Sequence, residues 1–192
     1  GKLFLFSRGD GHEGQNISHL LTYLFKKSIL DNLPNNISIR GELIISKANF
    51  KKIDSFMKNA RNAVSGLVNS KTVDIRVSGV TKFVAYAILH PRYKQSDQMI
   101  LLHELGFETV YHAKIHENKL NDEVLKKTLT NRKKNSPYEI DGIVCIDDSV
   151  VYGHEGGYPE HARAFKMMTD DQVEIATVVK VIWTPSKYGI LY

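Results

Sequence analysis

The stretch Ser38-Ile39-Arg40-Gly41-Glu42-Leu43-Ile44-Ile45-Ser46 decides how the rest of the chain is interpreted. Its apolar and polar residues alternate, and successive residues of a strand point to opposite faces of a sheet. The alternation predicts a strand that carries Arg40 and Glu42 on one face. Two opposite charges on one sheet face indicate either a functional site or a cross-strand ion pair.

Outward from this strand, the chain mixes predicted helices and strands. Apolar periodicity and capping residues predict helices at 17–29, 47–60, 95–104 and 121–131, and strands at 2–6, 73–76, 82–89, 108–115, 138–146, 162–167 and 174–184. The strands do not follow the regular strand–helix alternation of a doubly wound sheet. The pattern therefore predicts an α+β fold with mainly antiparallel sheets and flanking helices.

Composition excludes several classes of protein. The 192 residues are 42% hydrophobic, and no apolar run approaches the roughly 20 residues that span a bilayer. Cys145 is the single cysteine, so an internal disulfide or a cysteine-cluster zinc site is excluded, and we expect an intracellular protein in which Cys145 lies in the core. A net charge of +5 favours polyanionic partners, although a basic surface that serves only solubility has the same charge.

Five short motifs occur together in one order. They are Arg8-Gly9-Asp10-Gly11, Arg40-Gly41-Glu42, Ala60-Arg61-Asn62-Ala63, Tyr138-Glu139-Ile140-Asp141-Gly142-Ile143-Val144 and Ala164-Phe165-Lys166. In this order the chain resembles the adenylation domain of NAD-dependent DNA ligases. The resemblance implies a ligase-type, ATP-grasp-like nucleotidyltransferase domain at 1–172 and the start of an OB-fold at 173–192.

The resemblance also implies a reaction. Such ligases join nicks in duplex DNA in replication and repair: a lysine in a Lys-x-Asp-Gly motif takes AMP from NAD, AMP passes to the 5′-phosphate, and the 3′-hydroxyl displaces it. No Lys-x-Asp-Gly occurs in this chain. We therefore expect a truncated domain that is inactive alone, in a parent enzyme that uses NAD and Mg²⁺ and binds nicked DNA as a monomer without membrane contact.

By resemblance, three residues surround the reacting phosphate. Glu42 would bind the ribose, Asp141 would help to hold Mg²⁺ as a catalytic and metal-binding carboxylate, and Lys166 would face the α-phosphate. Without the resemblance, an ion pair with an arginine is the favoured interpretation of Glu42, and Asp141 is equally well explained as an acid at the start of a strand before a glycine. Lys166 stands in an otherwise apolar strand, where a lysine is costly to bury unless its ammonium finds a partner.

Other candidates would bind the nucleotide or DNA. Tyr86 resembles the aromatic residue that stacks on adenine, and Arg8 would contact phosphate or ribose. Arg61 would bind phosphate near the nick. The basic run Arg132-Lys133-Lys134 would add a functional cation, although a solvated helix end explains such a run equally well. Asp147-Asp148 is interpreted as a turn, because the histidines and acids show no metal-ligand spacing.

Two residues depart from the family pattern. Ile146 stands where the family carries a lysine that contacts adenine, and Asn69 stands where a second arginine is expected. An apolar side chain cannot donate that hydrogen bond, so adenine recognition is either rebuilt or weakened. Two alternatives therefore stay open beside an NAD-dependent ligase: an ATP-dependent polynucleotide ligase, and a noncatalytic nucleic-acid-binding module derived from a ligase.

Overall fold

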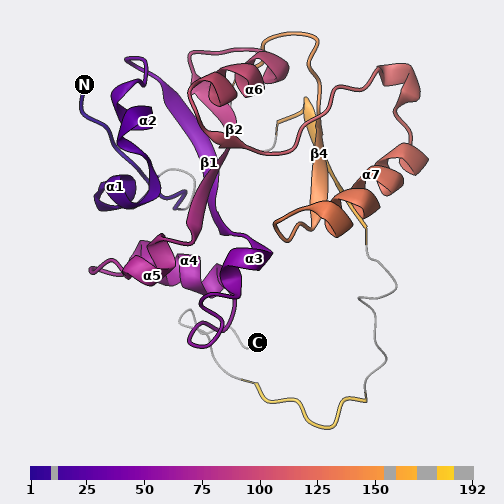
Figure 1. The fold of residues 1–192 in the computed structure, drawn as a ribbon. Helices are drawn as coiled ribbons and strands as arrows, with labels where there is room; N and C mark the ends of the chain where they lie inside the picture. Colours follow the sequence, from indigo (N-terminus) through magenta and orange to yellow (C-terminus); the bar gives the residue numbers. More distant parts are fainter. Residues whose placement is uncertain (10–12, 154–158, 168–176, 184–192) are drawn as a thin grey trace.

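The computed structural model describes residues 1–9, 13–153, 159–167 and 177–183, and it confirms the α+β class (Figure 1). Its helices are η1 (Ser18–Leu20), α1 (Leu21–Leu24), α2 (Lys27–Asp31), α3 (Lys47–Phe50), α4 (Ala60–Asn69), α5 (Ile75–Ser78), α6 (Gln95–Glu104), η2 (Glu117–Lys119) and α7 (Asp122–Asn135). Its strands are β1 (Ser38–Ile45), β2 (Thr81–His90), β3 (Glu108–Thr109), β4 (Gly142–Ile146) and β5 (Ala162–Lys166).

The larger sheet has the order β1-β2-β3. β1 and β2 run antiparallel, with Glu42 opposite Val84, and the short β3 adds to β2 in parallel. The exposure of β1 alternates along the strand, so that Ser38, Arg40 and Glu42 are all exposed. The structure thus confirms that Arg40 and Glu42 lie on one face.

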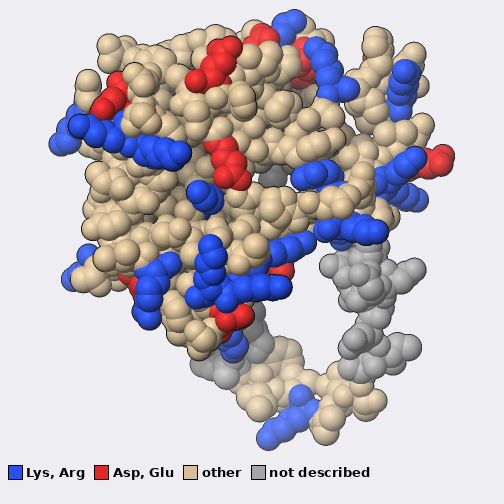
Figure 2. All heavy atoms as spheres, in the orientation of Figure 1, with Lys and Arg blue, Asp and Glu red and all other residues tan. Residues whose placement is uncertain are grey.

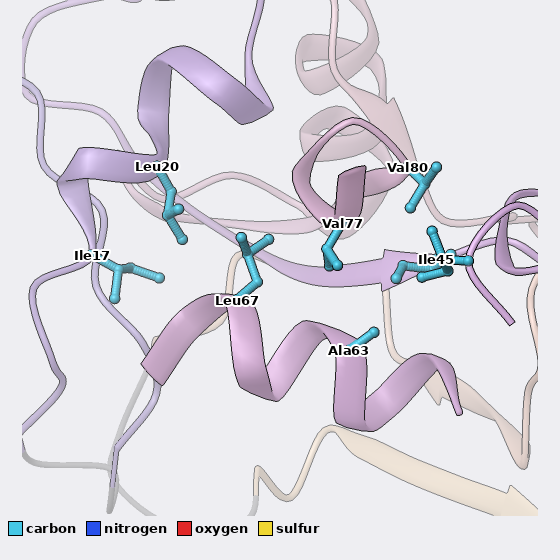
Figure 3. Packing of buried hydrophobic residues seen from close by; sticks show 8 residues of the cluster. Ile17, Leu20, Ile45, Ala63, Leu67, Val77 and Val80 are labelled. Atoms are coloured by element: carbon cyan, nitrogen blue, oxygen red, sulfur yellow. The ribbon is translucent and has the colours of Figure 1, made fainter. Parts of the chain in front are cut away.

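The opposite face of this sheet packs on two hydrophobic clusters. In the first, residues from β1, α4 and α5 converge with Leu20, which is fully buried (Figure 3). In the second, β2 packs on α6 through Ala85, Ile88, Met99 and Leu102. Burial of such side chains contributes about 1.5–3 kcal/mol each, so these clusters fix the sheet face that remains open.

β4 and β5 form a separate antiparallel pair, beside which α7 lies (Figure 1). Several contacts join this pair to the rest of the molecule. The Lys47 amide donates to Pro137 O at 2.8 Å, and the Asp148 carboxylate accepts from the Ser96 amide at 2.9 Å. Asp148 also forms an ion pair with Lys114 at 2.8 Å. The second sheet is therefore anchored to the first residues of both α3 and α6.

Three expected elements differ in the structure. A strand was expected at 73–76, but residues 75–78 form α5 because the Asp74 carboxylate caps the helix by accepting from the Arg76 amide. The helix expected at 17–29 breaks where Phe25 turns extended and its ring packs 5.2 Å from that of Phe83. The helix expected at 47–60 ends after one turn at Phe50, and Asn59 caps a new helix, α4.

The strand expectations were partly correct. No strand forms at 2–6, where Phe6 makes only an isolated bridge to Asn16. The strand expected at 108–115 pairs with β2 only at β3, and the one expected at 138–146 begins at Gly142. The boundary near 172, and most of the OB-fold start at 173–192, lie outside the described residues. Residues 177–183, which are described, form neither helix nor strand. In the described part of the chain, no helix has the length and apolar character to cross a membrane.

We predict that Asp148→Asn destabilises the fold above about pH 4. Burial alone raises the pKa of Asp148, but the Lys114 ammonium and the hydrogen bonds from Ser96 outweigh it and lower the pKa from 3.8 to about 2. A carboxyl group whose pKa is lower in the folded protein than in the unfolded chain stabilises the fold. The full stabilisation is present at pH values above the pKa of the unfolded chain, and it is lost as the pH falls toward the pKa of the folded protein. The contribution is about 2 kcal/mol.

Urea unfolding of both proteins at several pH values measures this effect. The difference in unfolding free energy between wild type and Asp148→Asn is expected to shrink as the pH falls from 4 to 2. A difference that does not depend on pH would show that the Asp148 carboxylate contributes no charge-dependent stability.

Candidate functional site

The two sheets line one large open cleft. The exposed face of β1 and β2 contributes Arg40, Glu42 and Tyr86, and Arg8 adds a cation from the loop before η1. The β4–β5 pair contributes the other side chains, including Lys166, and Asp141 precedes β4. Four of the five motifs found in the sequence supply a residue named here, and the fifth supplies Arg61, which also lines the cleft.

Tyr86 lies at the centre of a group of charges. Its side chain is partly exposed, at 37%. Burial raises the pKa of Tyr86, the negative charge of Glu42 raises it further, and the positive charges of Arg40 and Arg8 lower it. The structure therefore brings together an aromatic ring, a carboxylate and two guanidinium groups on one sheet face.

Glu42 and Arg8 are available to a ligand. No ion pair joins Glu42 to any residue that the structure describes, so the expected alternative, an ion pair between Glu42 and an arginine, is not formed among these residues. Arg8 precedes Gly9, whose φ of +57° permits a tight turn. A Cβ at Gly9 would lie 1.6 Å from Glu13 O, so the turn that carries Arg8 requires glycine there. Residues 10–12 of the motif lie outside the described residues.

Lys166 and Asp141 lie together at one end of the second sheet. Lys166 is paired with Gly142 across β4 and β5, and its Nζ lies 3.8 Å from Asp141 Oδ2. Their side chains are 67% and 86% exposed. The expectation that Lys166 bears a burial cost is therefore wrong, because strand pairing turns this side chain to solvent. An exposed pair at this separation contributes little to stability, and both groups remain accessible.

Gly142 makes room for Lys166. A Cβ at Gly142 would lie 2.8 Å from Lys166 Cγ and 2.6 Å from Phe165 O. Any side chain there would displace Lys166 or separate the two strands. The glycine of the Asp-Gly motif is thus required by the close approach of β4 to β5.

The basic run at the end of α7 is partly engaged within the protein. Lys133 donates to Met167 O at 3.2 Å, which places its ammonium beside the end of β5 and thus near Lys166. The Arg132 guanidinium lies 4.0 Å from the centre of the Tyr111 ring. Of these two basic residues, Lys133 is the one that lies near another predicted site residue, Lys166.

Arg61 lies in the first turn of α4, which Asn59 caps. The Arg61 side chain is exposed and makes no hydrogen bond or ion pair with the described part of the chain. Asn69 is the last residue of α4, and its Nδ2 donates to Ser65 O at 2.9 Å. The Asn69 side chain thus hydrogen-bonds to its own helix. Figure 2 shows Lys and Arg gathered over α3, α4 and α5, and these residues form a broad basic surface.

Ile146 ends β4 with a side chain that is 37% exposed and lines the cleft. Beyond it, the rings of Tyr152 and His161 stack at 4.1 Å, and the Tyr152 hydroxyl donates to the Asp147 carboxylate. Asp147 also accepts from the Ser149 amide at 2.8 Å, as expected of a turn. The apolar replacement of the expected lysine thus faces the cleft. Cys145, on the other face of β4, is only partly buried.

Sequence reasoning missed several residues near the cleft. Gln95, the first residue of α6, donates from Nε2 to Tyr86 O at 3.0 Å. The Tyr138 hydroxyl donates to Glu108, and burial together with that carboxylate raises the pKa of Tyr138. No local sequence signal marks either contact, because each joins residues brought together only by the sheet. The ion pair between Asp148 and Lys114 was missed for the same reason. The residues around Asp148 predict a turn and do not indicate which distant side chain it contacts.

The described residues contain no cluster of three or more His, Cys, Asp or Glu side chains suited to a metal. Asp141 is a single exposed carboxylate. Mg²⁺ is commonly held by one or two carboxylates together with water and substrate phosphate, and one such oxygen ligand is what this end of the cleft offers.

Comparison with known proteins agrees with this arrangement. The family model for the NAD-dependent DNA ligase adenylation domain matches residues 5–169. The chain is 41% identical to a DNA ligase of Acanthamoeba polyphaga mimivirus, over 99% of this chain and 30% of that protein. It is 32% identical to putative DNA ligase 205R of Invertebrate iridescent virus 6, over 98% of this chain and 32% of that protein.

A bacterial relative, the DNA ligase of Mycoplasmopsis agalactiae, is 27% identical over 95% of this chain and 29% of its own length. The chain therefore spans about a third of the length of these curated relatives. The family match covers most of the chain and includes every motif that lines the cleft. The chain belongs to the family of NAD-dependent DNA ligase adenylation domains.

Proposed function

We propose that this chain forms the nucleotide- and DNA-phosphate-binding part of an NAD-dependent DNA ligase that seals nicks in duplex DNA. The observation that supports the proposal is that Tyr86, Glu42, Arg8, Asp141 and Lys166, which come from different segments of the chain, line one open cleft. Phosphoryl transfer needs cations, an oriented nucleotide and little other covalent help from a protein. Arg8 and Lys166 supply cations to the cleft, and Tyr86 and Glu42 offer the contacts that would orient a nucleotide.

In this proposal, the side chains act on different parts of NAD. Tyr86 offers an aromatic face to adenine, and Glu42, which has no ion-pair partner among the described residues, accepts a hydrogen bond from a ribose hydroxyl. Lys166 leaves Asp141 and turns toward the α-phosphate, where its positive charge stabilises the charge that develops as AMP is transferred. Arg8 contributes a second cation to the nucleotide.

The family takes NAD as its AMP donor. Because the chain holds no Lys-x-Asp-Gly motif, the proposal assigns the attacking lysine to another part of the ligase. Mg²⁺, when bound, neutralises phosphate charge, and the Asp141 carboxylate is the residue proposed to hold it. The Asp141–Lys166 distance of 3.8 Å is compatible with this role, since the pair is loose enough to open.

DNA binding is assigned to the basic surface. Arg61 would contact a phosphate at the nick, and Lys133 would contribute from the end of α7 together with Arg132. These contacts position the duplex and do not read its sequence.

The first test is the intact mass of the ligase that contains this chain after incubation with Mg²⁺ and either NAD or ATP. We expect an AMP-sized addition with NAD alone, because the chain belongs to the NAD-dependent family. Addition with ATP alone would replace the proposal with an ATP-dependent ligase. No addition from folded protein with either nucleotide would favour the noncatalytic nucleic-acid-binding module.

A second prediction concerns Lys166. In the same ligase, Lys166→Ala should lower the rate of AMP addition by about 100-fold, the effect of removing one preorganised charge from a transition state. The melting temperature should stay unchanged, because the side chain is 67% exposed. Lys126→Ala, on the exposed surface of α7 outside the cleft, is the matched control and should retain full activity. Normal turnover of Lys166→Ala would remove this residue from the site.

A third prediction concerns Arg61. Removal of one phosphate-binding cation should weaken binding to nicked DNA and reduce the slope of log K against log salt by about one. Fluorescence anisotropy at several salt concentrations measures both quantities for Arg61→Ala and for the control Lys127→Ala, an exposed α7 residue outside the cleft. Equal salt slopes in wild type and Arg61→Ala would show that Arg61 contacts no phosphate.

A further inference from the structure

Tyr86 occupies an irregularity of the β1–β2 ladder. Arg40 is paired with Ala87 and Gly41 with Ala85, so Tyr86 has no opposite residue on β1. This is a β-bulge, in which one extra residue leaves the ladder and its side chain is re-aimed. The Tyr86 carbonyl accepts a side-chain donor from outside the sheet.

Gln95 supplies that donor. Its Nε2 lies 3.0 Å from Tyr86 O. Gln95 is partly buried and lines the cleft, and it also lines a small recess together with Ile146, Tyr93, Tyr152 and His161. The same side chain is thus next to the backbone of the aromatic residue and next to the apolar end of β4.

Half of the Gln95 amide remains available. A glutamine amide has two donor hydrogens and an acceptor oxygen, and the contact with Tyr86 O uses one hydrogen. Its Oε1 and its second hydrogen make no hydrogen bond within the described residues. The Tyr86 carbonyl also fixes which way the amide points, because a flipped amide would set its oxygen against the carbonyl oxygen.

We propose that Gln95 reads the edge of the purine base that stacks on Tyr86 and makes the site specific for adenine. This inference rests on the proposed function, since it takes adenylate as the ligand. Adenine presents an amine donor beside a ring-nitrogen acceptor, which match an amide oxygen and an amide hydrogen, and glutamine pairs with adenine in this way elsewhere. Ile146 cannot supply such a contact.

Hypoxanthine provides the discriminating comparison. It differs from adenine by a carbonyl oxygen in place of the amine, and that oxygen would face Gln95 Oε1. Because the Tyr86 carbonyl holds the amide in one orientation, Gln95 cannot turn to accommodate the change. If Gln95 only positioned Tyr86, its removal would weaken the binding of both purines equally. The stacking of a base on an aromatic ring does not depend on the hydrogen-bonding groups at the edge of the base.

Ligand-observed NMR titration of the chain with AMP and with IMP tests the proposal. Wild type should prefer AMP by about tenfold, at the lower end of what one good bidentate base contact supplies. Gln95→Met, which keeps the length of the side chain without its hydrogen bonds, should lose this preference. The control Ile100→Ala changes an exposed residue of α6 outside the cleft and should keep it.

Three results would overturn the proposal. Equal affinity of wild type for AMP and IMP would show that no base edge is read, and equal weakening of both by Gln95→Met would reduce Gln95 to a positioning residue for Tyr86. Failure of wild type to bind either nucleotide would contradict the proposed function itself. If Gln95→Met does not fold, as circular dichroism would show, Gln95→Asn withdraws the amide by one methylene and gives the same comparison.

Discussion

The antiparallel pairing of β1 with β2 is the constraint on which the cleft depends. The two strands approach so closely at Gly41 that a Cβ there would lie 2.5 Å from Phe83 Cζ and 2.6 Å from Val84 O. Because side chains alternate between faces, the pairing that buries Leu43 and Ile45 also leaves Glu42 exposed. A slip of one residue would exchange the faces, and the hydrophobic clusters oppose such a slip.

Polar contacts join the segments around the second sheet to the rest of the molecule. The Asp148 carboxylate joins the segment after β4 to α6 and to Lys114, and Tyr138 is joined to Glu108 beside β3. These contacts bring Lys166 to the cleft on a strand instead of a loop. The strand fixes the Lys166 backbone, so only the side chain has to be ordered when its ammonium meets a phosphate.

Much of the fold could be predicted from local pattern. The alternation of β1, the helix at 95–104 and the start of the helix expected at 121–131 were all correctly predicted, because each depends on neighbouring residues alone. The short motifs also lie around one cleft, as the resemblance implied. The resemblance supplied the roles assigned to them, and these remain proposals.

The rest depends on contacts between distant segments. Phe25 leaves the helical pattern because its ring joins those of Phe83 and Phe107, and no periodicity in its own segment indicates this. The exposure of Lys166 follows from pairing with Gly142, which the sequence of β5 does not reveal. Gln95 was missed for the same reason: the carbonyl to which it donates belongs to Tyr86 on β2, and nothing in the pattern of α6 indicates this contact.

A crystal structure of the chain with AMP would test the central claim most directly, because that claim is the assembly of one nucleotide site from both sheets. We expect the adenine ring on Tyr86, the ribose within hydrogen-bond distance of Glu42, and the phosphate beside Lys166, with the Lys166–Asp141 pair opened. Well-ordered AMP that contacts only one of the two sheets, or that binds outside the cleft, would contradict the account.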